Sequence, residues 1–77
     1  MKQLTNNEVV TRSGRLDTVT TFLIQPTGGD VIAQVYINDA WVDMKTFAEN
    51  DAVDIVIKSD VQWRFTIPTG SSVYYYI

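Results

Sequence analysis

Apolar and polar residues alternate with a period of two along most of the chain. The alternating segments are 31–37, 41–47, 53–57, 61–67 and 73–77, and polar or turn-forming residues separate them. Side chains of a β-strand point to its two sides in turn, so this pattern predicts a strand in each segment. No segment has sustained helical spacing. We therefore expect essentially no helix beyond a single turn.

Upstream of these segments the pattern is weaker but still typical of strands. Residues 16–24 are rich in Thr and β-branched side chains, with Gly14 as a turn before them and a Pro-Thr-Gly-Gly-Asp turn at 26–30. Residues 5–11 form either a short edge strand through Val9 and Val10 or an arm. The prediction is an all-β chain: a compact six- to seven-stranded antiparallel β-sandwich or flattened barrel with short turns. Residues 1–13 would be an N-terminal arm or edge strand, and 14–77 a single β-sandwich domain.

If odd and even positions keep their sides through the turns, the alternation divides the side chains between two faces. The predicted core is Val35, Ile37, Trp41, Phe47, Val53, Ile55, Ile57, Val61, Trp63, Phe65, Ile67, Val73, Tyr75 and Ile77. The opposite face is also partly apolar, with Tyr36, Val42, Met44, Val56, Tyr74 and Tyr76 among polar residues. Apolar surface of this kind marks interfaces, where Tyr and Met are enriched. We predict an interface that includes Tyr36, Met44, Tyr74, Tyr76 and the apolar C-terminal residue Ile77.

Composition narrows the classes of function. The chain has 77 residues, which is one domain at most, and a net charge of −3, which provides no basic surface for nucleic acid or an anionic membrane. It has no signal-peptide pattern and no apolar run near the roughly 20 residues of a membrane span. Cysteine and histidine are absent, so thiolate, imidazole and Cys/His zinc chemistry is excluded. A domain this small usually needs additional stabilisation from a disulfide, a metal or a partner chain. Without cysteine and histidine, self-association is the remaining common source.

The carboxylates are the remaining candidates for chemistry. Asp39 and Asp43 flank Trp41 and could be read as a glycosidase pair, but Asp at turns more often bonds its own backbone. Glu49-Asn50-Asp51 with Asp54 could hold a weak Ca²⁺, although the spacing of a known calcium loop is missing. Gly28-Gly29 lacks the ending of a phosphate loop and is interpreted as a turn. We expect no enzyme activity, no catalytic residue, no cofactor and no bound metal.

The aromatic residues permit a glycan-binding alternative. Trp41 and Trp63 share the apolar phase with Ile and Val, which favours the core over a sugar platform. Tyr36, Tyr74 and Tyr76 lie on the other phase and could form either a glycan platform or a protein interface. The small size of the domain and the lack of a disulfide or a Cys/His metal site favour the protein interface.

From Gly14 onward the layout resembles that of small all-β structural proteins of tailed bacteriophages. The resemblance rests on a Thr-rich strand before a Gly-Gly turn, on the segments at 31–37, 39–42, 45–47 and 61–65, and on a Tyr-rich last strand. It implies a non-enzymatic virion structural protein, in first place a capsid cement or decoration protein that is made in the host cytoplasm and located in the virion. The expected partners are further copies of itself, with a trimer favoured because capsid lattices offer three-fold sites, and a major capsid or other virion protein. The alternatives are a glycan- or receptor-binding module and a small tail or adaptor protein.

Overall fold

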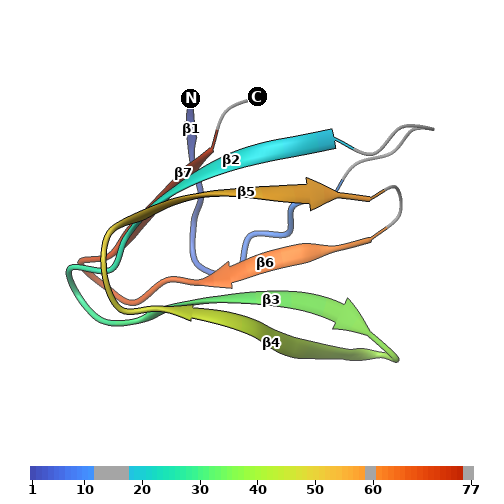
Figure 1. The fold of residues 1–77 in the computed structure, drawn as a ribbon. Helices are drawn as coiled ribbons and strands as arrows, with labels where there is room; N and C mark the ends of the chain where they lie inside the picture. Colours follow the sequence, from blue (N-terminus) through green and yellow to red (C-terminus); the bar gives the residue numbers. More distant parts are fainter. Residues whose placement is uncertain (12–17, 59–60, 76–77) are drawn as a thin grey trace.

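The protein is a β-sandwich of two antiparallel sheets. The computed structural model describes residues 1–11, 18–58 and 61–75 (Figure 1). Its strands are β1 (Lys2–Gln3), β2 (Thr18–Gln25), β3 (Val31–Ile37), β4 (Ala40–Phe47), β5 (Asp51–Ile57), β6 (Trp63–Thr66) and β7 (Ser72–Tyr75). One sheet has the order β1-β7-β2-β5 and the other β4-β3-β6, and neither closes into a barrel. The predicted fold class is thus confirmed as a sandwich. The described residues include no helix long and apolar enough to cross a membrane.

The core lies between the sheets and centres on β2. Phe22 is fully buried, and its ring centroid lies 4.9 Å from that of Phe65 and 5.8 Å from that of Tyr75. The predicted core residues that are buried are Val35, Phe47, Ile57, Phe65 and Val73. Sequence reasoning did not assign Leu4, Phe22, Ile24, Val31 and Ala33 to the core, and these are buried as well.

Two core predictions at the β3–β4 hairpin are wrong: Trp41, because the hairpin turn reverses the alternation, and Ile37, because it lies at the exposed end of β3. Asn38 and Asp39 both have positive φ and form a two-residue turn, so Ile37 lies opposite Ala40. Odd positions of β3 therefore face even positions of β4. Trp41 pairs with Tyr36 on the outer face of the sheet and is only half-buried. Ile37 is 44% exposed at the end of β3, next to the turn and beyond Val35, the last residue of β3 that pairs with β6.

A β-bulge then restores the original alternation. The register shifts between Ala33 and Gln34, which pair with Lys45 and Asp43, so Met44 is the extra residue of β4. Beyond the bulge Phe47 pairs with Val31, and both are buried, as the sequence pattern predicts for Phe47. Between the turn and the bulge, Val42 pairs with the buried Val35 and lies on the inner side, so its predicted place on the outer face is wrong.

The N-terminal segment closes one side of the sandwich. β1 pairs with β7, Leu4 is buried, and its backbone N–H donates to the carbonyl of Val73. The chain then crosses to the other sheet (Figure 1). There the backbone N–H of Asn7 donates to the carbonyl of Phe65, and Val10 forms a β-bridge with Trp63. The Lys2–Glu8 ion pair, 2.7 Å long, braces this crossing. A single segment thus lies along β7 of one sheet and β6 of the other.

Hydrogen bonds join two turns, at 26–30 and at 68–71, at one end of the sandwich. The backbone N–H of Gly28 donates to Ser71 Oγ at 3.0 Å, and Ser71 Oγ donates to the carbonyl of Gly29 at 2.8 Å. A Cβ atom on Gly28 would overlap the carbonyl oxygen of Thr69, so only glycine fits there. The predicted Gly28-Gly29 turn therefore has a packing role. The predicted turns at Gly14 and at 59–60 lie outside the described residues.

Candidate functional site

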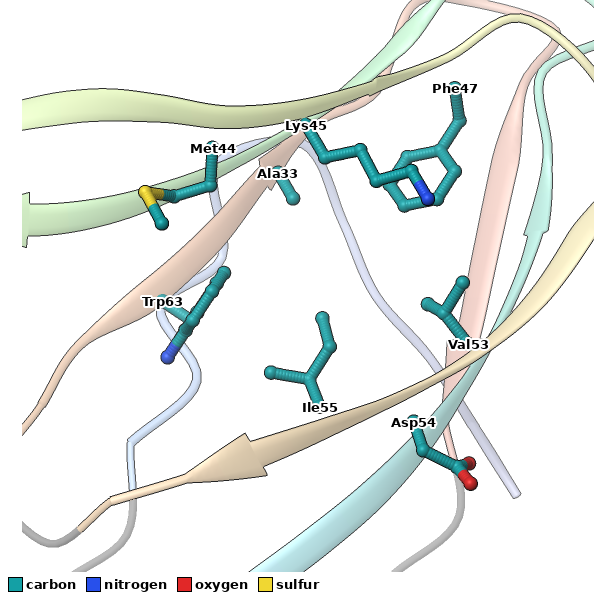
Figure 2. A pocket seen from close by; sticks show the side chains of 8 residues that line it. All are labelled: Ala33, Met44, Lys45, Phe47, Val53, Asp54, Ile55 and Trp63. Carbon is teal, nitrogen blue, oxygen red and sulfur yellow. The ribbon is translucent and has the colours of Figure 1, made fainter.

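The side of the sandwich opposite the N-terminal segment is open, and an apolar cleft lies there between the sheets. Its volume is about 370 Å³, and Figure 2 shows side chains from β3, β4, β5 and β6 around it. The lining residues are Ala33, Met44, Lys45, Phe47, Val53, Asp54, Ile55 and Trp63. We call this cleft, together with the two strands at its mouth, β4 and β5, the open side.

The open side exists because both strands at its mouth are edge strands. β5 has β2 as its only partner and β4 has β3 as its only partner among the described strands. Val53 and Ile55 point into the cleft from β5 and are half-buried, as is Trp63 on β6 (Figure 2). The sequence pattern predicts all three for the core, and they do pack against it, but none of the described strands covers Val53 and Ile55 at the free edge of β5.

The bulge shapes the rim of the cleft on the β4 side. It brings Met44 and Lys45, although adjacent in sequence, to the lining of the same cleft. Met44 is 54% exposed, and Lys45 Nζ lies 5.1 Å from the centroid of the Phe47 ring. This cation–π contact places a positive charge at the mouth of an otherwise apolar cavity.

Only one carboxylate lines this cleft within the part of the chain that the structure describes. It belongs to Asp54, which points away from the cavity in Figure 2 and accepts a hydrogen bond of 2.6 Å from Thr21 Oγ1 on β2. Hydrolysis of a glycoside uses two carboxyl groups that face each other across the substrate. The cleft does not provide that pair. Its chemistry suits apolar side chains.

A second surface feature lies on the outer face of the three-stranded sheet, and we call it the Trp41 cluster. Arg64 Nε donates to Gln34 Oε1 at 2.7 Å, and Gln34 Nε2 donates to Asp43 Oδ1 at 2.6 Å. The Arg64 guanidinium carbon lies 4.3 Å from the Trp41 ring centroid. The Tyr36 and Trp41 ring centroids are 5.2 Å apart. The cluster thus joins the charged groups of Arg64 and Asp43 and the rings of Tyr36 and Trp41 into one packed layer.

Three of the five predicted interface residues lie in the described part of the chain, and the structure does not bring these three together. Tyr36 is 41% exposed and belongs to the Trp41 cluster, whereas Met44 lies at the cleft. Tyr74 is half-buried on β7 of the other sheet, where it pairs with Leu23. Tyr76 and Ile77 lie outside the described residues. The sequence pattern gives Tyr36 and Tyr74 the same phase of alternation. Both lie on an outer face, but the two faces belong to different sheets.

Four acidic residues that the sequence offers for chemistry have local roles, namely Asp39, Asp43, Asp51 and Asp54. Asp39 occupies a turn with φ of 61°, and Asp43 belongs to the Trp41 cluster. In the segment considered for Ca²⁺, Asp51 accepts from the backbone N–H of Ala52 at 2.8 Å, while Asp54 is bonded to Thr21. Among residues 1–11, 18–58 and 61–75 there is no group of three or more acidic side chains that could hold a metal ion.

Glu8 has a clearly shifted pKa. The hydrogen bond from Lys2 and that from the backbone N–H of Thr5 lower the pKa of Glu8 from 4.5 to about 2. Glu8 lies in the N-terminal segment, on the side of the sandwich away from the cleft. The shift therefore reflects the bracing of that segment.

Comparison with known proteins gives no relative from which a function could be transferred. The chain matches no protein-family model, and no curated protein or solved structure is similar to it. The function has to be argued from the open side and the Trp41 cluster themselves.

Proposed function

We propose that this chain is a non-enzymatic structural protein that works by contact with other proteins, as a cement or decoration protein of a bacteriophage capsid does. The observation that carries the first part is the open side: an apolar cleft lies between two edge strands. Large exposed apolar residues lie on its two strands, Val42 and Met44 on β4 and Val56 on β5. Val19 and Ile37 are further exposed apolar residues outside it. A small domain with this surface gains stability when another protein covers it.

The virion part of the proposal is supported by the layout of the sequence. A Thr-rich strand, a Gly-Gly turn, regular short strands and a Tyr-rich end resemble small structural proteins of tailed phages. In such a role the work is done by surface burial between larger subunits, which requires interface residues and no catalytic group. The proposed partner is a major capsid protein or another virion protein.

The composition of particles tests this proposal. Particles of the phage whose genome encodes this chain would be purified on a density gradient and analysed by quantitative mass spectrometry. We expect the chain in the particle fraction at a fixed ratio to the major capsid protein. Its presence in the host extract but not in particles would contradict the virion role.

The Trp41 cluster supports a second candidate, a glycan-binding module. Tyr36 and Trp41 provide rings, and Gln34, Asp43 and Arg64 provide polar groups beside them. However, Arg64 already lies over the Trp41 ring at 4.3 Å, so a sugar would have to displace it to stack there. A glycan array separates the two candidates: binding that Trp41→Ala abolishes would favour the glycan-binding module.

A further inference from the structure

The sheet edges of this molecule differ in how they are protected against pairing with another strand. An unprotected edge presents a row of free N–H and C=O groups, and proteins usually cover it, shorten it, bulge it or place charges on it. The N-terminal segment covers β6 through Asn7 and Val10, and β1 has only two residues. β4 carries the bulge at Met44 and the inward-facing charge of Lys45.

Within the part of the chain that the structure describes, β5 is neither covered, shortened nor bulged at its free edge. It pairs with β2 over seven consecutive positions, from Thr18↔Ile57 to Ile24↔Asp51, without a register shift. No Pro, Lys or Arg interrupts it between Asp51 and Ile57. Its central charge, Asp54, is held against Thr21 of the neighbouring strand, on the side away from the free edge. Val56, on the same outer face, is 48% exposed.

We propose that β5 pairs antiparallel with β5 of a second copy about a two-fold axis that passes at Ile55. The faces restrict the choice of register, because inward residues must lie opposite inward residues for the two cores to join. An axis at Asp54 satisfies this rule but places the two Asp54 carboxylates directly opposite each other, which destabilises a pair. An axis at Ile55 shortens the overlap but removes that repulsion.

With the axis at Ile55, the side chains of the two copies match. Ile55 lies opposite its own copy and Val53 opposite Ile57, so apolar residues meet on the inner face. On the outer face Asp54 lies opposite Val56. Its diagonal neighbours are the second Asp54 and Lys58, whose positive charge is within reach of a long side chain at about 7–8 Å. The charge of Lys58 thus offsets the remaining repulsion.

The same axis also accounts for the cleft. A two-fold axis perpendicular to the sheet keeps the inner faces of both copies on one side, so the two clefts open towards each other. Each copy then covers the half-buried Val53 and Ile55 of the other, and the exposed Met44 lies at the rim of the joined clefts. An interface of this kind is self-complementary and closes as a dimer, so this pairing takes the place of the trimer that the phage resemblance favours. It goes beyond the proposed function, since a monomer could also decorate a particle.

Sedimentation velocity from micromolar to millimolar concentration tests the pairing. The wild type should pass from monomer to dimer. Val56→Asp places a carboxylate opposite Asp54 twice in each dimer and should raise the dissociation constant roughly tenfold. Val19→Asp is the matched control, because Val19 is the cross-strand partner of Val56 on β2 and is 61% exposed, but lies away from the edge. It should leave the dissociation constant unchanged.

A charge exchange tests the register. Adding Asp54→Lys to Val56→Asp places Lys opposite Asp and should return the dissociation constant to near that of the wild type. With the axis at Asp54, the same double variant would instead set two lysines face to face. Circular dichroism would show that each variant keeps its fold.

Three results would overturn the pairing: a wild type that remains monomeric at millimolar concentration, equal weakening by Val19→Asp and Val56→Asp, or no rescue by the double variant. None of them would affect the virion proposal, which particle composition tests separately.

Discussion

The reversal of alternation at the β3–β4 hairpin makes a quantitative prediction about Trp41 and Phe47. Both are aromatic residues at odd positions of one strand, so a straight alternation buries both. In the structure Phe47 is 4% exposed in the core, and Trp41 is half-buried on the outer face against Arg64 and Tyr36. Truncating the two side chains should therefore have different costs.

The costs follow from the contacts that each side chain makes. Phe47→Ala empties a packed core position and should cost about 3–5 kcal/mol. Trp41→Ala loses a cation–π contact worth about 0.5–1 kcal/mol and an aromatic pair worth about 0.5–1.5 kcal/mol, in addition to the apolar burial of a ring that is only half-buried, and leaves no core cavity, so it should cost less than Phe47→Ala. A domain of this length has a total stability of roughly 4–12 kcal/mol. Trp41→Ala should stay folded, whereas Phe47→Ala should approach the limit of stability.

Urea denaturation followed by circular dichroism measures both costs. Each kcal/mol should also lower the Tm by about 4–8 °C. If Trp41→Ala cost as much free energy of unfolding as Phe47→Ala, Trp41 would belong to the core. The turn at Asn38 and Asp39 would then not reverse the alternation, and the hairpin register would be wrong.

Three further predictions follow from local geometry. Gly28→Ala should destabilise the fold by about 3 kcal/mol, because the new Cβ would force apart the two turns that Ser71 links; an unchanged denaturation midpoint would contradict this packing. Asp39→Gly should stabilise the hairpin by up to about 1 kcal/mol, since glycine tolerates positive φ; a lower Tm would contradict the turn. Glu8→Gln should flatten the pH dependence of the Tm between pH 4.5 and about 2: the lowered pKa of Glu8 means that its stabilising effect is full above the ordinary value and is lost as the pH falls towards 2. The effect should be small and salt-sensitive because the ion pair is exposed, and an identical pH profile of wild type and variant at low salt would contradict it.

The sequence predicts the strands well because strand alternation is a local property. The predicted segment 31–37 coincides with β3, and Phe47, Phe65 and Val73 are buried as expected. The alternation failed at Trp41, where a two-residue turn exchanges odd and even positions. Asn and Asp at such a turn are a readable signal, because both tolerate positive φ. The bulge at Met44 has no such signal, since it arises from pairing with β3.

The candidate site was less predictable because it depends on which strands share a sheet. Alternation tells which side of a strand a residue occupies, but not to which sheet that strand belongs. Tyr36 and Tyr74 therefore looked like neighbours, whereas pairing places them on different sheets. Met44 was identified as exposed, and it is, but the open side could not be inferred. It lies on the side that the N-terminal segment leaves uncovered, and the course of that segment depends on the long-range contacts of Leu4 and Val10.

Hydrogen exchange of the backbone amides of β5 tests the role of the open side most directly. The amides of β5 that point towards β2 are protected by sheet pairing at any concentration, whereas those on the free edge are protected only when a second strand covers them. We expect the exchange of alternate β5 amides to slow as the concentration rises from micromolar to millimolar, while rates in β4 change little because its bulge resists pairing. Exchange in β5 that is independent of concentration, or slowing confined to another strand, would contradict contact through this edge.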